Sequence, residues 1–163
     1  MGIFDKLFHK SQSEHPVITA PVAGTAVSLQ EVNDPTFSQE ILGKGIAIRP
    51  TEGQIVAPCD GKVDMMFDTG HAVSLISTNG MEILIHVGLE TVQLKGKYYT
   101  THAKTGDTVK QGQPMISFDR EAIAADGYDL ITPIVLCNSD RFPILQAHLG
   151  AVSAGDPLLT IDA

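Results

Sequence analysis

Residues 69–88 read TGHAVSLISTNGMEILIHVG, with two alternating apolar runs on either side of Asn79-Gly80. An Asn-Gly pair between such runs is a strong signal for a β-hairpin, because a type I′ turn needs positive φ at both central residues. If these two residues form the loop, Val73 lies opposite His86. The two histidines, His71 and His86, are then diagonal neighbours roughly 7–8 Å apart.

In this register, one face of the hairpin carries both histidines and the other face is apolar, because residues two apart on a strand point to the same side. The predicted histidine face consists of Thr69, His71, Val73, Leu84, His86, Gly88 and Glu90. The predicted core face consists of Ala72, Ser74, Ile76, Met81, Ile83, Ile85 and Val87. A three-residue loop would flip one strand relative to the other and separate the histidines.

The composition indicates one globular domain. The chain has 163 residues, of which 43% are hydrophobic, and this is enough to bury a core. No apolar run approaches the roughly 20 residues that span a bilayer, and no signal peptide is visible. The net charge of −8 argues against nucleic acid and fits either solubility or a basic protein partner. Cys59 and Cys137 follow no metal or redox spacing, so we expect free cytosolic thiols.

From Pro16 onward, the chain contains short β-prone runs separated by Gly and Pro. Examples are Val17-Ile18, Gly24–Leu29, Gly45–Arg49, Lys62–Phe67, Val73–Ile76, Met81–Val87, Met115–Phe118 and Ile131–Cys137. Turn signals every 8–12 residues predict an all-β fold, an antiparallel β-sandwich or barrel-sandwich with only short helical turns. The best helical candidates are Pro35–Leu42 and Phe142–Leu149.

Two sequence patterns that each occur twice predict a pseudo-duplicated architecture. The pattern A-P-x-x-G occurs at Ala20–Gly24 and again at Ala57–Gly61. The pattern V-x-x-G-x-P, two apolar residues, Ser or Thr, one apolar residue and Asp occurs at Val109–Asp119 and at Val152–Asp162. Two copies do not make a solenoid, so we interpret the second pattern as a turn-plus-strand unit used twice in a pseudo-symmetric sandwich.

We expect residues 1–15 to form a separate N-terminal segment and residues 16–163 to form the domain. Ile3, Phe4, Leu7 and Phe8 are spaced as on one face of a helix. Residues 1–10 could therefore make a short amphipathic helix in peripheral contact with a membrane, or a terminal segment that packs on its own domain.

His71 and His86 are the candidate chemical groups among six histidines, since they share a face with polar neighbours. Two neutral imidazoles close together can ligate a metal, act as acid and base, or carry a phosphoryl group. A metal site would need a third ligand, which Glu90 could supply, but no H-x-H or H-E-x-x-H spacing occurs. The residues alone leave three interpretations open: histidines with only a structural role in the core or at the surface, a metal site, and nucleophilic or phosphoryl chemistry.

Several segments of the chain resemble one bacterial protein family. The most specific is the motif H-x-G-[ILV]-[DE]-T-V-x-L-x-G, present as His86–Gly96 and preceded by Gly70-His71-Ala. Further matching segments are Ile18–Gly24, Leu42–Pro50, Val56–Gly61 and Leu130–Val135. Together they cover essentially the whole chain, which resembles the glucose-type enzyme IIA (EIIA) components of the bacterial phosphoenolpyruvate-dependent sugar phosphotransferase system.

The resemblance implies a phosphocarrier. His86 matches the histidine that accepts a phosphoryl group from phospho-HPr, as a tele-phosphohistidine, and passes it to a cysteine of an EIIB domain for sugar uptake. His71 matches the second histidine, which stabilises the phosphoryl group, and Thr69 matches the residue that orients its ring. The carbonyl of Gly88 matches the acceptor that sets the tautomer of His86. No metal or cofactor is implied for the transfer, since phosphohistidine is already a high-energy donor.

The resemblance also implies a partner-binding surface around the histidines. Its apolar rim excludes water and contacts partners, and it matches Phe37, Ile41, Leu42, Phe67, Val73, Leu84 and Val92. An acidic fringe that faces basic HPr matches Asp34 and Glu90. The net charge of −8 would then steer the encounter electrostatically.

Further expectations follow from the family. The protein would be cytoplasmic and would regulate permeases or kinases when it is unphosphorylated. Its histidine pair would also bind zinc at a partner interface, so the alternative function is a zinc-binding or purely regulatory interaction protein. The chain has no IIB-like cysteine motif and no membrane-spanning segment. We therefore expect it to serve a separate EIIBC permease or to be cut from a fusion, with the sugar determined by that partner.

Two other classes are disfavoured because their key residues are missing. Gly106–Gln113 resembles the turn of lipoyl and biotinyl carrier domains, but no lysine stands at a protruding hairpin tip in the required context. A zinc peptidase of the lysostaphin type would need an H-x-H ligand pair, which the sequence lacks.

Overall fold

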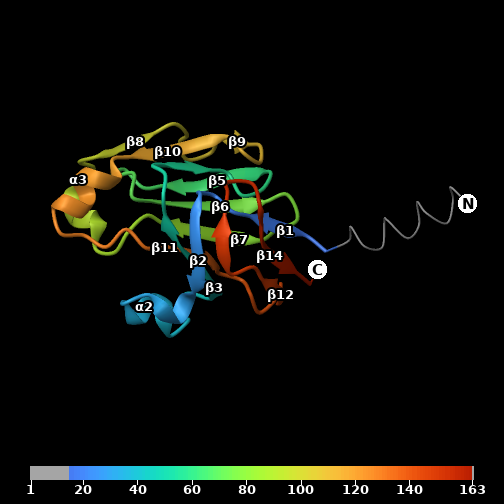
Figure 1. Cartoon of the computed structure of the whole chain (residues 1–163). Helices are drawn as coiled ribbons and strands as arrows, with labels where there is room; N and C mark the ends of the chain where they lie inside the picture. The colour runs from blue at the N-terminus through green and yellow to red at the C-terminus, as the bar shows by residue number, and fades with distance from the viewer. Residues whose placement is uncertain (1–14, 163) are drawn as a thin grey trace, which may run out of the picture.

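The computed structural model describes residues 15–162, and its regular elements are mostly short β-strands joined by turns (Figure 1). The strands are β1 (Val17–Thr19), β2 (Gly24–Ser28), β3 (Lys44–Pro50), β4 (Gln54–Val56), β5 (Gly61–Met66), β6 (Ala72–Ser77), β7 (Glu82–His86), β8 (Tyr99–Thr101), β9 (Thr108–Val109), β10 (Pro114–Phe118), β11 (Thr132–Leu136), β12 (Ile144–Ala147), β13 (Gly150–Val152) and β14 (Pro157–Ile161). The helical elements are short: two 3₁₀ helices, η1 (Leu29–Glu31) and η2 (Thr91–Leu94), and two α-helices, α2 (Pro35–Ser38) and α3 (Arg120–Ala125).

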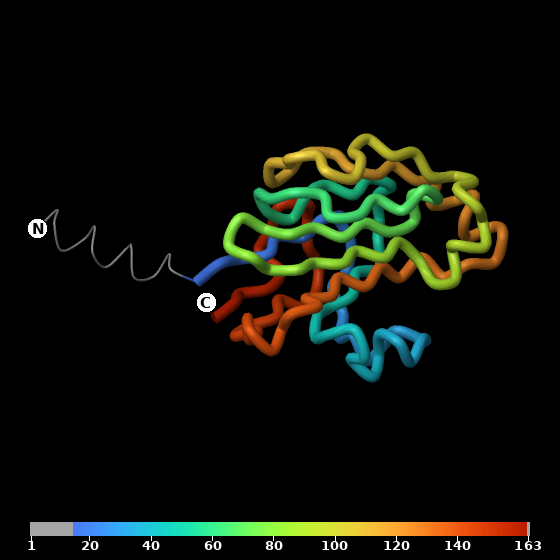
Figure 2. Tube along the Cα trace, turned by 180° about the vertical axis from the view of Figure 1, so that it is seen from behind, coloured from blue at the N-terminus to red at the C-terminus, as the bar shows by residue number. Residues whose placement is uncertain are grey.

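The strands form one large and two small antiparallel sheets. The large sheet has the order β13-β2-β3-β11-β7-β6-β5-β9, and the small sheets have the orders β1-β14-β12 and β4-β10-β8. Figures 1 and 2 show β8 and β10 lying above β5 and β6 as a separate layer. The all-β prediction is confirmed, because each predicted β-prone run contains or overlaps a strand.

The predicted duplication is confirmed by the strand pairing. In one half, β2 pairs with β13 and β3, while β14 pairs with β1 and β12. In the other half, β5 pairs with β9 and β6, while β10 pairs with β4 and β8. Each A-P-x-x-G segment ends where β2 or β5 begins, and each V-x-x-G-x-P segment carries the turn into β14 or β10. The halves meet where β11 pairs with β7, with Ile134 opposite Ile85.

Buried apolar side chains form two cores, and these lie on opposite sides of the large sheet at β3 and β11. The main core contains fully buried residues from both halves, including Ile48, Leu75, Ile85 and Ile134. Burial of each such side chain contributes about 1.5–3 kcal/mol to stability. A second, smaller core lies on the other side of β3 and β11 and consists of Leu29, Val32, Phe37, Ala47, Leu89, Ile131 and Val135. This second core anchors the segments that flank His86.

The hairpin register predicted from Asn79-Gly80 is wrong by one residue. Leu75 lies opposite Ile83 and Ala72 opposite His86, so the loop has three residues rather than two. Distant side chains stabilise the wider loop, since Asn138 donates to the Gly80 carbonyl and accepts from the Glu82 amide. Ala72, Ser74 and Ile76 therefore share the side of His86, and Val73 and Leu75 enter the main core.

The two helical predictions had different outcomes. A helix begins at Pro35 as predicted but ends at Ser38, with the Asp34 side chain accepting from the Thr36 amide. The predicted helix at Phe142–Leu149 is wrong, because Ile144–Ala147 form β12 and pair with β14. Tertiary pairing with a neighbouring strand overrides a weak helical pattern over so few residues. The sequence analysis missed α3, whose first turn is capped by Asp119.

The expected amphipathic segment of residues 1–10 lies outside the described residues. Between residues 15 and 162, the helices are all too short to cross a membrane. Cys59 and Cys137 are free thiols, as predicted.

Candidate functional site

His71 and His86 lie side by side although the predicted register is wrong. Their ring centroids are 5.0 Å apart, and the rings meet edge to face at 80°. His86 is the last residue of β7, whereas His71 lies just before β6. The alternation of side chains along a strand therefore does not determine the direction of the His71 side chain. The expectation that a three-residue loop separates the histidines is therefore wrong. A backbone hydrogen bond of 2.6 Å, from the Val87 N–H to the His71 carbonyl, holds the two segments together instead.

The Gly88 carbonyl sets the tautomer of His86. His86 Nδ1 lies 2.7 Å from Gly88 O, and because a carbonyl only accepts, Nδ1 carries the proton and Nε2 keeps a free lone pair. Gly88 has a φ of +87°, and a Cβ there would lie 2.6 Å from Thr91 Cγ2. Only glycine fits this position without strain.

Thr69 holds the ring of His71. Thr69 Oγ1 lies 2.5 Å from His71 Nδ1, and the His71 side chain is almost completely buried. The intervening Gly70 has a φ of +71° and donates its N–H to the Phe67 carbonyl, forming a tight turn between β5 and β6. The structure thus brings Thr69, His71, His86 and the Gly88 carbonyl together at one place.

Both imidazoles are neutral at pH 7. Burial lowers the pKa of His71 to about 4, and the neighbouring His86 adds to this shift. Burial also lowers the pKa of His86, although the Gly88 carbonyl and the Asp34 carboxylate oppose the shift. A neutral imidazole is the form that acts as a nucleophile or ligates a metal.

Two of the predicted apolar residues, Phe37 and Phe67, pack against the histidine rings. The Phe37 ring lies 5.3 Å from His86, and the Phe67 ring lies 5.4 Å from His71. Leu84 is half-buried, and the exposed predicted members are Ile41, Leu42 and Val92. The prediction that Val73 belongs to the partner-binding rim is wrong. Because the register turns it away from His86, Val73 is fully buried in the main core and cannot contact a partner.

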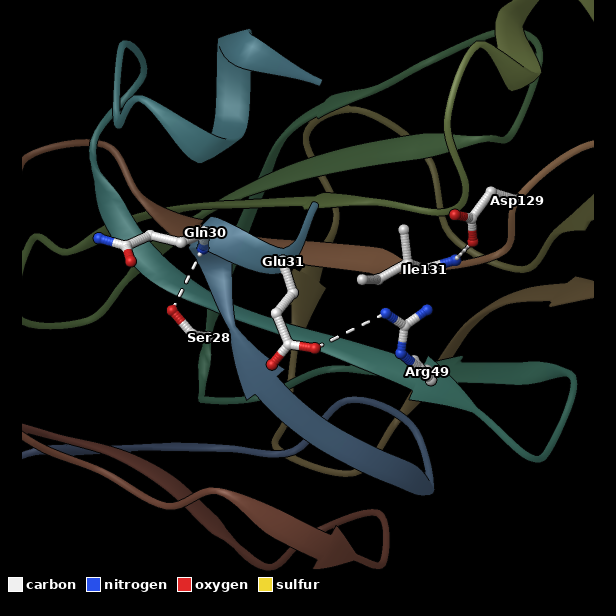
Figure 3. A network of polar contacts seen from close by, with 6 residues as sticks. All are labelled: Ser28, Gln30, Glu31, Arg49, Asp129 and Ile131. Atoms are coloured by element: carbon white, nitrogen blue, oxygen red, sulfur yellow. Dashed lines mark hydrogen bonds and ion pairs between the residues drawn. The ribbon is translucent and has the colours of Figure 1, made fainter. Parts of the chain in front are cut away.

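The predicted acidic residues line a common cleft, which is also bordered by Leu89, the residue after Gly88. Asp34 and Glu90 both border a cleft of about 540 Å³, together with Tyr128 and Asp129, which the sequence analysis did not single out. Asp129 also accepts the Leu89 amide through its carbonyl at 2.9 Å, next to Gly88. Its side chain accepts from the Ile131 amide, as Figure 3 shows beside the Glu31–Arg49 ion pair.

Two further residues contact the site without having been predicted. The hydroxyls of Thr91 and Tyr99 each lie 2.8 Å from the Val87 carbonyl, between His86 and Gly88. Thr91 was not predicted as a site residue, although it stands within the motif His86–Gly96, which is the signal that could have identified it. Tyr99 carries no sequence signal, since it comes from β8 in a different sheet.

A resident metal site is not formed by the described side chains. In residues 15–162, no three His, Cys, Asp or Glu side chains are placed to hold one ion. Glu90, which could have supplied a third ligand, does not complete such a group with the two histidines. The geometry instead combines a free imidazole nitrogen, a second imidazole, an apolar surround and an acidic cleft.

Comparisons with known proteins identify the family of the chain. The family described as phosphoenolpyruvate-dependent sugar phosphotransferase system, EIIA 1, matches residues 16–142. A glucose-specific EIIA component of Staphylococcus epidermidis is 44% identical over 85% of each chain. A beta-glucoside-specific EIIBCA component of Dickeya chrysanthemi is 49% identical over 85% of this chain, which spans only 22% of that longer protein.

A solved structure shows the same fold. The glucose permease IIA of Mycoplasma capricolum superposes with a TM-score of 0.87 and 31% identity, covering 90% of this chain and 96% of that chain. The chain therefore belongs to the EIIA type 1 family and is a phosphoryl-transfer component of the sugar phosphotransferase system.

Proposed function

We propose that His86 accepts a phosphoryl group from phospho-HPr and passes it to the cysteine of an EIIB domain. The observation that supports this most directly is the Nδ1–H bond from His86 to the Gly88 carbonyl, which leaves the Nε2 lone pair free. In the first step, a P–N bond breaks on HPr and a P–N bond forms at His86 Nε2. In the second step, that bond breaks and a P–S bond forms on EIIB, so His86 is neutral again.

His71 has the role of stabilising the transferred group. A loose, in-line phosphoryl transfer needs positioning and charge stabilisation more than covalent chemistry. If Thr69 donates to Nδ1 of His71, the Nε2 of that ring carries the proton and can donate to a phosphoryl oxygen. Burial keeps this donor fixed in a site from which the surrounding apolar side chains exclude water.

The surfaces around the pair fit the two partners. Asp34 and Glu90 at the acidic cleft would face the basic surface of HPr, and the net charge of −8 would increase the encounter rate. The EIIBCA relative carries its EIIA region in one chain with EIIB and EIIC, which supports EIIB as the acceptor. We place this exchange in the cytoplasm, with regulation of permeases or kinases by the unphosphorylated form as an added role.

Incubation with phosphoenolpyruvate, enzyme I and HPr tests the proposal. We expect an adduct that is stable in alkali and labile in acid, and its complete loss in His86→Gln. His102→Gln is the matched control, because His102 is exposed and bonded to Ser117 in another sheet. Labelling of His86→Gln at the wild-type rate would contradict the assignment of the nucleophile.

The role of His71 is tested by onward transfer. His71→Gln should still accept the phosphoryl group but should pass it slowly to an EIIB domain. Because the relatives include glucose-specific and beta-glucoside-specific components, EIIB domains of both systems should be tried as acceptors. Rapid onward transfer by His71→Gln would rule out the stabilising role.

A further inference from the structure

We propose that Tyr99 and Thr91 are positioning residues: their hydroxyls hold the Val87 carbonyl and thereby fix the turn that presents the Gly88 carbonyl to His86. The inference rests on the proposed function of His86. Neither residue reaches the imidazoles by a hydrogen bond of its own; both act through the backbone.

The turn after β7 is held at three successive peptide units. The first unit donates the Val87 N–H to the His71 carbonyl at 2.6 Å. The second accepts at the Val87 carbonyl from both hydroxyls. The third donates the Leu89 N–H to the Asp129 carbonyl and accepts His86 Nδ1 at the Gly88 carbonyl. Because each unit is planar, rotation of the second unit would move the Gly88 carbonyl away from His86.

The hydroxyls are the donors that the buried Val87 carbonyl requires. Val87 is fully buried and lies past the end of β7, so the strand ladder does not supply a partner. A buried carbonyl without a donor is disfavoured, and the turn would rotate to find one. Burial raises the pKa of Tyr99 to about 12, so its hydroxyl keeps its proton throughout the physiological range.

Tyr99 also contacts the segment that carries His71. A Cβ placed on Gly70 would lie 3.1 Å from the Cβ of Tyr99, so these two residues are in close contact. The Tyr99 ring stacks on Phe118 of the neighbouring strand β10 at 6.3 Å. One side chain from the small sheet therefore touches the turns that carry both histidines, and its own position is set by packing outside the site.

The variants Tyr99→Phe and Thr91→Val, alone and combined, test the role. We expect roughly threefold to tenfold slower phosphoryl uptake in each single variant and a larger loss in the double variant, because one remaining hydroxyl still holds the carbonyl. Thr91→Ser should restore most of the rate lost in Thr91→Val. Tyr98→Phe is the matched control, since that hydroxyl bonds Asp126 at the surface.

A spectroscopic measurement separates positioning from a loss of folding. Long-range ¹H–¹⁵N spectra of the imidazoles should show a single Nδ1–H tautomer of His86 in the wild type and a mixture of tautomers in the double variant. If the double variant does not fold, Tyr99→Phe alone provides this measurement. Unchanged tautomer and uptake within twofold of the wild type, in folded protein, would overturn the inference. A tautomer change in a protein whose wild type takes up no phosphoryl group would refute the proposed function and leave the positioning role in place.

Discussion

The two halves of the sandwich share their strand pairing, but only one of them carries the histidines. The half built from β4 to β10 is continuous in the chain, and the other half comes from β1–β3 and β11–β14. Their registers correspond: Ala72 at the start of β6 lies opposite His86 at the end of β7, and Lys44 at the start of β3 lies opposite Leu136 at the end of β11.

The counterpart of the histidine pair is a glycine and a leucine. The residue before β6 is His71, and the residue before β3 is Gly43. A Cβ on Gly43 would lie 2.4 Å from the Leu136 carbonyl, so the backbones are too close for any side chain there. The same strand frame therefore supports a reactive pair in one half and close backbone packing in the other. The two halves differ in the segments that connect their strands: in the half with the histidines, β7 is followed by the turn through Gly88 and by η2.

Substitutions in the two equivalent pairs, His71 with His86 and Gly43 with Leu136, should have very different effects on phosphoryl transfer. His86→Gln should lower phosphoryl acceptance by at least about 1,000-fold with little change in the free energy of unfolding. Leu136→Ala should cost about 2–5 kcal/mol of stability, because it leaves a cavity in the core, while folded protein still accepts the group. Urea unfolding and phosphoryl labelling measure the two effects. Loss of labelling in folded Leu136→Ala would show that the halves are coupled.

A second comparison concerns the glycines that open β2 and β5. A Cβ on Gly24 would lie 2.1 Å from the Arg49 carbonyl oxygen, and one on Gly61 would lie 2.3 Å from the Ile76 carbonyl oxygen. Gly24→Ala and Gly61→Ala should each lower the free energy of unfolding by roughly 3–5 kcal/mol, since backbone must move in both cases. If denaturant titrations find a large decrease in the free energy of unfolding for only one variant, the two halves are not energetically equivalent.

The stability of the protein should also depend on pH, because the half that carries the histidines buries His71. The pKa of His71 is about 4 in the folded protein, below its ordinary value of 6.5. Between these values the unfolded chain binds a proton that the folded chain does not, so stability falls as the pH drops from 6.5 towards 4. The loss should be about 3 kcal/mol. His71→Gln should lack this part of the pH dependence in urea titrations at pH 4.5 and 7.5, and identical profiles would contradict the burial of a neutral His71.

The smallest expected effect concerns the two turns of the repeated V-x-x-G-x-P pattern. Gly112 and Gly155 have φ values of +87° and +93°, with open space around each. Gly112→Ala and Gly155→Ala should each cost about 1 kcal/mol, because only the backbone conformation is disfavoured. Thermal unfolding should give equal shifts in melting temperature, and a difference between the two would show that the turns are not equivalent.

The sequence by itself predicted the strand-rich architecture and its duplication. Alternating apolar residues indicate half-buried strands, and the repeated turn residues of Val109–Asp119 and Val152–Asp162 mark equivalent bends, so these features depend on local chemistry. The Asn79-Gly80 hairpin pattern brought His71 and His86 together as candidates, and the family resemblance carried by the motif His86–Gly96 gave each of them its expected role.

Only the tertiary structure decided how that site is assembled. The hairpin loop takes three residues because Asn138, more than fifty residues away, bonds both sides of it, and this moved Val73 into the core. Within the predicted helix Phe142–Leu149, residues Ile144–Ala147 form a strand because they pair with β14. Tyr99 reached the Val87 carbonyl from another sheet. Each outcome depends on contacts between residues that are distant in the chain, and a local pattern of apolar and turn residues does not encode such contacts.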